Sequence, residues 1–314
     1  MINKREFLQG LVALLAVSAT RGSIAGTVSS GDVGNFEYVY SNPALRRNFL
    51  AFLTNVFHLY PEQEFHDVLV RLSKPGTSDR DIYAALQQEL SEIQPFLGAL
   101  RYAIPALSKQ KAIMAEQTLK LLDPDARYEG HLEIGSTGRY ISVLEDELDI
   151  RGDVFLLHTR EAGYGPEDIV ERGQLGKIGK YIDLNDYSPQ LANIIPPGSL
   201  DLVTVFIGFH HCPLSKRKAF ISSVRDVIRP GGTLILRDHD AHNEDLRRTA
   251  ALAHDTFNAG TDETWQFNAS ELRNFYSLRF IIDTLEELGF THRGKTLFQP
   301  GDPTRNGLTA FTRV

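Results

Sequence analysis

From Gly130 onward the chain alternates short apolar runs with helical segments, and this alternation restricts its fold more than any other feature. Seven runs have the length and composition of strands: 131–134, 153–158, 180–184, 200–209, 232–238, 293–300 and 307–314. Helical patterns between the earlier runs predict parallel pairing, with crossover helices on both faces of one sheet. The last two runs are joined by a short turn region, so they pair antiparallel or flank another strand in opposite directions. We therefore expect an α/β fold with a doubly wound, mostly parallel, seven-stranded sheet and an antiparallel last strand.

A helical pattern precedes this region. Leu45, Phe49, Phe52 and Val56 recur at three- and four-residue spacing, which predicts one apolar helix face. The pattern contains no phosphate loop, metal motif or nucleophile elbow. Residues 36–127 are therefore expected to form a helical cap on the following domain, and the cap also offers a surface for a homodimer.

The first residues resemble an export signal. Lys4 and Arg5 precede an apolar stretch at 11–17, and the small residues Ser23 and Ala25 follow it. The start is similar to a twin-arginine signal in which Lys4 replaces the first arginine, and the stretch is short for a transmembrane helix. We expect a signal peptide and linker over 1–35 and hence export to the periplasm. An ordinary amphipathic helix in a cytoplasmic protein is the alternative.

Composition narrows the class of protein. The 314 residues are 42% hydrophobic and carry a net charge of -7, which is typical of a soluble globular protein and gives nucleic acid no basic surface to bind. We therefore expect no nucleic-acid partner. The single cysteine, Cys212, excludes an intrachain disulfide and a cysteine-rich zinc site.

A glycine-containing turn follows the first strand of the sheet. Gly135 ends the strand and Gly138 opens the next helix, so a ligand can approach bare backbone at a helix N-terminus. The spacing is G-x-x-G, and Thr137 stands where a dinucleotide fold has its middle glycine, which disfavours a pyrophosphate. Glu133 brings a carboxylate to the same strand end, which suits a cationic ligand.

Three motifs in order give the chain a family resemblance. "LEIGSTG", "SLDLVTVFIGFHH" and "IRPGGTLILRD" resemble the first glycine motif, the fourth strand and the Pro-Gly-Gly turn of the class I S-adenosylmethionine-dependent methyltransferases. The likeness covers residues from about 128 to 314 and is closest to the branch that methylates quinones and small molecules. It implies a Rossmann-like methyltransferase domain over 128–314, S-adenosylmethionine as cofactor and a small-molecule methyl acceptor.

The resemblance also implies roles for individual residues. Four of them would line the methionine moiety and ribose edge of the cofactor: Glu133, Gly135, Ser136 and Gly138. Asp186 matches the carboxylate that accepts the adenine amino group, with Asp183 as the alternative. Ile207, Gly208 and Phe209 would run beneath the sulfonium.

One position departs from the family pattern. Where the family has an acidic residue that binds both ribose hydroxyls, the second strand here ends at His158, and Glu161 is the nearest acid. His158 is therefore the candidate ribose contact. Arg160 would suit the phosphate of NADP, which keeps an NADP-dependent oxidoreductase as a second hypothesis. A catalytically silent cofactor-binding protein is the third.

Histidines follow the fourth strand. Methyl transfer needs a base only if the acceptor is a hydroxyl or an acidic carbon, and His210 or His211 would serve, with His210 favoured. The alternative is that both histidines are structural, one packing in the core and the other binding backbone.

Further acidic and imidazole side chains follow the fifth strand: Asp238, His239, Asp240 and His242. Neighbouring parallel strands bring this stretch close to His210 and His211. Carboxylates and imidazoles gathered in this way can bind a divalent metal. The spacing matches no common ligand motif, so the sequence does not predict a metal site. The long segment that comes next offers aromatic side chains for an apolar or aromatic acceptor, or for a core: Trp265, Phe267, Phe275 and Tyr276.

Overall fold

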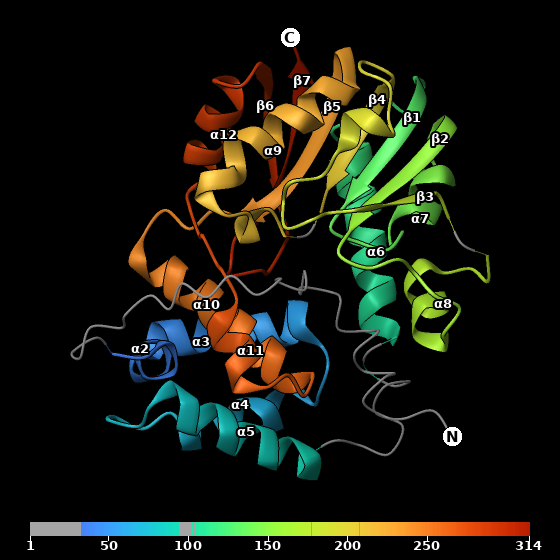
Figure 1. The fold of residues 1–314 in the computed structure, drawn as a ribbon. Helices are drawn as coiled ribbons and strands as arrows, with labels where there is room; N and C mark the ends of the chain where they lie inside the picture. The colour runs from blue at the N-terminus through green and yellow to red at the C-terminus, as the bar shows by residue number, and fades with distance from the viewer. Residues whose placement is uncertain (1–32, 94–101, 103, 177, 207) are drawn as a thin grey trace.

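The computed structural model describes residues 33–93, 102, 104–176, 178–206 and 208–314. The expected signal segment therefore lies almost entirely outside the described residues, as does Ile207. Figure 1 shows two layers: a sheet flanked by helices, and a group of helices packed beneath one end of its strands.

The sheet has seven strands in the order β3-β2-β1-β4-β5-β7-β6. Their bounds are β1 Arg127–Ile134, β2 Asp149–His158, β3 Lys180–Asp183, β4 Leu200–Val205, β5 Ile228–His239, β6 Phe290–Phe298 and β7 Asn306–Arg313. Strands β1 to β5 pair in parallel, and β7 runs antiparallel to both β5 and β6. The predicted doubly wound sheet with an antiparallel last strand is confirmed. The strand order reverses direction between β1 and β4.

Helices cover both faces of the sheet. They are α6 Ile104–Leu119, α7 Ile141–Glu145, α9 Leu214–Val227 and α12 Leu278–Glu286. Helix α8 Pro166–Arg172 lies beyond the ends of the strands, and its Val170 packs on the core of the helical layer. Alternate strand residues enter different cores: in β4, Leu202 joins the cluster beneath α6 and α7, and Val203 joins the cluster beneath α9 and α12. Both faces of β4 are apolar because both are covered.

A second set of helices forms the other layer. From the N-terminal part come α2 Asn35–Ser41, α3 Pro43–Phe52, the π-helical turn η1 Leu53–Phe57, α4 Glu62–Leu72 and α5 Asp79–Ile93. Asn42 starts α3 by accepting a hydrogen bond from Ala44 N at 2.9 Å, and Pro43 occupies the first helical position. The predicted apolar face is buried, with Phe49 and Phe52 almost fully enclosed.

This helical layer also takes in a segment far away in the sequence. Helices α10 Glu244–Gly260 and α11 Trp265–Ser270 lie between β5 and β6 in the chain but pack among α2 to α5 (Figure 1). Phe257 of α10 meets Phe57 edge to face, with ring centroids 6.2 Å apart, and Tyr60 donates a hydrogen bond to Gly260 O at 2.8 Å. The helical layer is therefore built from two separate stretches, whereas the sequence predicted a cap from 36–127 alone.

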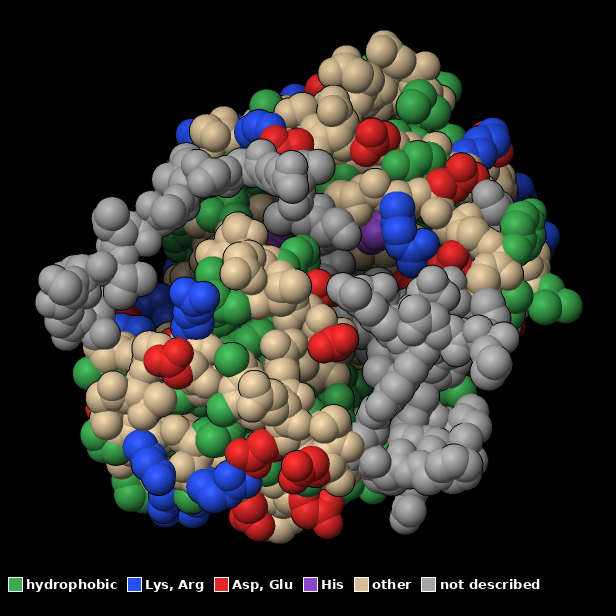
Figure 2. Space-filling model, turned by 60° about the horizontal axis from the view of Figure 1, so that its bottom comes forward, with side chains coloured by type: hydrophobic (Ala, Val, Ile, Leu, Met, Phe, Trp, Pro, Cys, Tyr) green, Lys and Arg blue, Asp and Glu red, His purple; other side chains and the backbone are tan. Residues whose placement is uncertain are grey.

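Two observations concern possible partners. Within the described ranges, no helix is both long and apolar enough to cross a membrane. On the face drawn in Figure 2, Lys and Arg side chains lie scattered among acidic and apolar ones. A homodimer through the helical layer stays a prediction.

Candidate functional site

The site begins where the strand order reverses. In open α/β sheets, ligands bind outside the carboxyl ends of the strands at such a switch point, here between β1 and β4. The loop after β1 has left-handed backbone at Gly135 (φ 86°) and Gly138 (φ 98°). Ser136 stabilises this turn, since its Oγ accepts hydrogen bonds from the backbone N of Gly138 and of Arg139, each at 3.1 Å. The two glycines share one tight turn, as predicted, but the helix that was expected to open at Gly138 begins only at Ile141.

Glu133 occupies the end of β1 and has no exposed surface. Ser136 Oγ donates a hydrogen bond to its Oε1, and the backbone N–H of Tyr140 also interacts with this carboxylate. Its Oε2 makes no geometrically defined hydrogen bond among the described residues. Burial raises the pKa of Glu133 to about 7. A buried carboxylate of this kind favours a positively charged or hydrogen-bond-donating ligand.

Arg139 lies in the same loop and is also fully buried. Its Nη2 donates to Glu171 Oε1 of α8 at 2.9 Å, while its Nε and Nη1 have no partner in the described part of the chain. The charges of Glu133 and Arg139 influence each other. The glycine turn therefore carries an acceptor and a donor side by side, both buried and both incompletely paired.

The end of β2 supplies further polar atoms. His158 is buried, and its Nδ1 lies 3.2 Å from the backbone N of Arg160. Its Nε2 has no partner among the described residues, and neither has Thr137 Oγ1 of the glycine loop. Burial lowers the pKa of His158, so the imidazole is neutral near pH 7. A small pocket lies here, lined by Thr137, His158 and Tyr181 among others.

Arg160 is already neutralised. Its guanidinium lies 2.8 Å from Asp168 Oδ1 and 3.8 Å from Glu171 Oε2. Two carboxylates beside this arginine leave little positive potential for a ligand phosphate. This arrangement disfavours the 2′-phosphate of NADP.

The predicted adenine contacts lie further out. Asp186 is exposed and forms an ion pair with Lys216 of α9. Asp183 accepts a hydrogen bond from Asn185 N at 2.9 Å. Neither residue lines the pocket beside His158. The loop itself lies close to the site, because Tyr187 donates a hydrogen bond to Gly208 O at 2.9 Å. A contact of Asp186 or Asp183 with adenine stays a prediction.

Gly208 makes the turn after β4. Its φ of 89° is left-handed, and the 3₁₀ turn η4 Phe209–His211 follows directly. This turn directs His210 and His211 into the interior, where both are buried. His210 Nδ1 lies 2.8 Å from Asp238 Oδ1 at the end of β5, as expected for neighbouring parallel strands.

The other acidic and imidazole side chains after β5 divide into two groups. His239 is buried with Asp238, and its Nδ1 lies 3.0 Å from Thr304 O. Asp240 instead accepts hydrogen bonds from Leu278 N and Arg305. His242 is exposed, and its Nδ1 lies 3.1 Å from Asp240 Oδ2. Only the first half of the stretch therefore faces His210.

Four buried imidazoles, His210, His211, His239 and His254, form a histidine cluster. The sequence did not predict that His254 belongs to it. This histidine lies on α10, is buried, and its ring centroid is 5.0 Å from that of His210 and 5.7 Å from that of His239. Phe275 packs against the same rings, 5.3 Å from His210 and from His254. A lone histidine within an amphipathic helix carries no motif, so only the packing of α10 against the sheet reveals it.

A larger cavity lies between the two layers. Its walls combine aromatic rings of the helical layer, including Phe52, Phe57 and Phe257, with two histidines, His239 and His254. The aromatic side chains singled out from the sequence lie elsewhere: Trp265 packs on Tyr83, and neither Phe275 nor Tyr276 lines this cavity. Phe267 does not line it either.

Comparison with known proteins gives likeness in fold only. No protein-family model matches the chain, and no curated protein matches it. A SAM-dependent methyltransferase from Aquifex aeolicus aligns with 73% of this chain and 98% of its own, at TM-score 0.44 and 15% identity. The 1,6-didemethyltoxoflavin-N1-methyltransferase of Burkholderia thailandensis covers 77% of this chain and 92% of its own, at TM-score 0.44 and 11% identity. Mitomycin 7-O-methyltransferase MmcR covers 88% of this chain and 70% of its own, at TM-score 0.45 and 16% identity. Identities of 11–16% and TM-scores of 0.44–0.45 do not assign a function to this chain.

Proposed function

We propose that this protein is an S-adenosylmethionine-dependent methyltransferase acting on a small apolar or aromatic acceptor. The observation that carries the proposal is Glu133, a fully buried carboxylate at the strand switch point with one oxygen unpartnered among the described residues. A polar ligand with a cationic group would satisfy that oxygen. The motif resemblance of residues 128–314 points to the same cofactor.

The charges at the glycine turn suit an amino-acid moiety. An ammonium group would meet Glu133 Oε2, and a carboxylate would meet Arg139, whose guanidinium interacts with the Tyr140 side chain but has no geometrically defined hydrogen bond at Nε and Nη1. Thr137 and His158 would provide hydrogen bonds to the remainder of the ligand at the end of β2. The cofactor supplies an electrophilic methyl group on sulfur, and the protein aligns it with the acceptor while excluding water.

The cavity between the layers is the candidate acceptor site. Its aromatic walls suit an apolar ring, and His239 and His254 give it a polar end. His239 is the last residue of β5, and β5 lies next to β4. The polar end of the cavity is therefore near the switch point between β1 and β4. We therefore infer that the acceptor enters between the helical layer and the sheet.

The competing NADP-dependent reductase is disfavoured by Arg160, whose guanidinium already pairs with Asp168. A catalytically silent binding protein retains the same pocket and differs only in turnover. The base role of His210 or His211 stays a prediction. That role requires an Nε2 atom that is free to take a proton from the acceptor.

Calorimetric titration of the full chain with S-adenosylhomocysteine and with NADPH separates the first two hypotheses. We expect S-adenosylhomocysteine to bind and Glu133→Gln to weaken it at least about tenfold, or about 1.4 kcal/mol. Glu129→Gln is the matched control, since Glu129 lies on the same strand and pairs with Arg127 near its other end. Preferential binding of NADPH, or no binding of either compound, would overturn the proposal.

Turnover requires a separate measurement. The protein is incubated with methyl-labelled S-adenosylmethionine and a panel of phenols, quinols, amines and thiols, and labelled products are followed by mass spectrometry. We expect label transfer to at least one aromatic acceptor. Cofactor binding without transfer to any acceptor in the panel supports the silent binding protein.

A further inference from the structure

Three histidines meet at one buried point: His210 and His211 from the turn after β4, and His254 from α10. One ring nitrogen of each lies within 4.8 Å of the other two. The exposed fractions of the three residues are 6%, 3% and 2%. Two elements distant in the chain thus converge on a set of imidazoles that the solvent scarcely reaches.

Hydrogen bonds orient two of these rings. His211 Nδ1 lies 2.7 Å from Leu272 O, and a carbonyl can only accept, so the proton is on Nδ1. His210 Nδ1 faces Asp238 Oδ1, which already accepts from His239 N and likewise takes a proton from the ring. In both histidines, Nε2 is consequently left with a lone pair.

The Nε2 atoms of all three rings have no hydrogen-bond partner among the described residues. These atoms, which belong to His210, His211 and His254, are all buried. An unpaired buried polar atom costs about 1–3 kcal/mol, and here three such atoms belong to rings that converge on one place. A single cation placed among them would satisfy all three.

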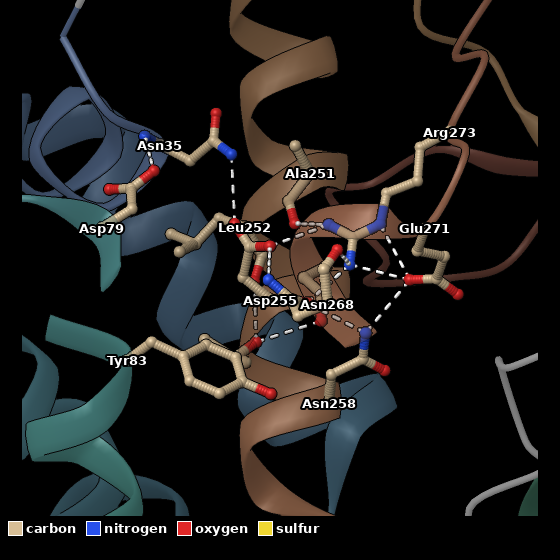
Figure 3. Close-up of polar contacts among 12 residues, drawn as sticks. Asn35, Asp79, Tyr83, Ala251, Leu252, Asp255, Asn258, Asn268, Glu271 and Arg273 are labelled. Carbon is tan, nitrogen blue, oxygen red and sulfur yellow. Dashed lines mark hydrogen bonds and ion pairs between the residues drawn. The ribbon is translucent and has the colours of Figure 1, made fainter. Parts of the chain in front are cut away.

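An oxygen ligand stands beside them. Glu271 Oε1 is buried, has no hydrogen-bond partner in the described part of the chain and lies 3.7 Å from His211 Nε2. That distance is too long for a hydrogen bond. The other oxygen, Oε2, is fixed by Arg273 Nη2 at 2.8 Å and Asn258 Nδ2 at 3.0 Å. Figure 3 shows Arg273 held between Glu271 and Asp255, so this carboxylate is anchored by a network of its own.

We propose that His210, His211 and His254 form a binding site for a divalent transition metal, with Glu271 as the fourth ligand. Imidazole nitrogens with one carboxylate match zinc and its first-row neighbours, whereas magnesium and calcium prefer oxygen ligands throughout. Ligand nitrogens around tetrahedral zinc stand roughly 3.4 Å apart, so the rings close by at most about 1.4 Å. Asp238 and Leu272 O complete the arrangement as groups that orient the ligand rings.

The site adjoins the cavity, because His254 also lines the cavity wall. The assignment replaces the prediction that His210 or His211 is a free base, since the metal takes the same lone pairs. It does not rest on the proposed methyl transfer, because metal binding is measured without cofactor or acceptor.

The test uses the full chain, purified without a histidine tag. We expect elemental analysis to find about one equivalent of zinc or a neighbouring metal per chain. After removal of the metal with a chelator, titration with Co²⁺ should give visible ligand-field absorption that saturates at one equivalent. His254→Gln should weaken Co²⁺ binding at least about 100-fold, and Glu271→Gln should weaken it and shift the absorption.

His292→Gln is the matched control. It removes a histidine whose Nε2 is already bonded to Thr309 Oγ1 at 2.7 Å, so Co²⁺ affinity should stay within about twofold of the wild type. If the cluster variants fail to fold, X-ray absorption at the zinc edge of the wild type still decides, and we expect imidazole scattering from three ligands. Metal-free protein that gives no Co²⁺ absorption, a spectrum without imidazole ligands, or wild-type affinity in folded His254→Gln would overturn the proposal.

Discussion

At the scale of single residues, Glu133 links ligand binding to pH. In the free protein, burial raises the pKa of Glu133 to about 7, so the carboxyl is mostly protonated at pH 6. A ligand ammonium group favours the ionised form, and binding then releases a proton. The affinity for S-adenosylhomocysteine should therefore rise between pH 6 and pH 8 and level off above, as measured by calorimetry in buffers of different ionisation enthalpy.

The variants isolate this contribution. Glu133→Gln cannot ionise, so its weaker affinity should be nearly independent of pH over the same range. Glu129→Gln should keep the wild-type slope, because it leaves the buried carboxyl unchanged. A wild-type affinity that does not change with pH would show that no cation meets Glu133.

Gly138 allows a prediction about backbone rather than contacts. A Cβ at this position would find Leu156 Cδ1 at 3.5 Å, an ordinary contact, so there is room for a methyl group. The φ of 98° is nevertheless a conformation that L-residues rarely adopt. Gly138→Ala should lower the free energy of unfolding by about 1–2 kcal/mol in urea denaturation.

The control for this change is Gly176→Ala. Gly176 has open space around its Cβ position and no left-handed φ, so its substitution should leave stability within about 0.5 kcal/mol. Equal losses in both variants would mean that the turn after β1 tolerates a side chain and is not held in the left-handed form.

At the scale of elements, the sheet could be predicted from the sequence because its signals are local. Apolar runs placed the strands, but the Pro-Gly-Gly stretch that was expected as a turn before the fifth strand lies inside β5, which begins at Ile228. The glycine turn and the pairing of His210 with Asp238 follow from parallel strands ending side by side. These predictions needed only periodicity and strand order.

What the sequence could not predict depends on long-range packing. Nothing local distinguishes His254 from a surface histidine, and Glu271 resembles any loop glutamate until Arg273 anchors it. Asp186 follows β3 as expected, yet its carboxylate pairs with Lys216 of a helix thirty residues later. Side-chain partners of this kind are set by which elements meet, and a single sequence does not contain that information directly.

The network around Arg273 joins α10 to the loop after α11, and removing its one guanidinium should be costly. Arg273 bonds Asp255 at 2.8 Å and Asn268 at 2.6 Å in addition to Glu271 (Figure 3). Arg273→Met would leave the buried carboxylates of Asp255 and Glu271 without the guanidinium that neutralises them, with an expected loss of about 3–5 kcal/mol in the free energy of unfolding. Thermal and urea denaturation measure it.

The comparison is Arg279→Met on α12. Arg279 pairs with Asp283 at 2.8 Å, but both side chains are exposed, so the pair should contribute at most about 0.5 kcal/mol. If the two variants differ by less than about 1 kcal/mol, the buried network is not what holds α10 and the following loop together.

At the scale of the whole molecule, the two layers are not two segments of sequence. The core of the helical layer unites Phe36, Phe49 and Phe65 of the N-terminal part with Leu252 and Phe257 of α10. The helical layer thus depends on both stretches, and the candidate acceptor cavity exists only where the layers meet.

Truncation tests this dependence. A fragment of residues 128–314 keeps every strand from β2 to β7 and nearly all of β1, but it loses α2 to α5 and the sheet-covering helix α6. Leu252 and Phe257, buried in the whole protein, would then face water, each at a cost of about 1.5–3 kcal/mol. This fragment should bind a hydrophobic dye and melt without a sharp transition, whereas residues 33–314 should unfold cooperatively.

Substituting Leu252 and Phe257 by Gln in the short fragment should reduce dye binding, because the exposed face of α10 is its source. A fragment of 128–314 that unfolds as sharply as the longer chain, with no dye bound, would show that the helical layer is a separable cap.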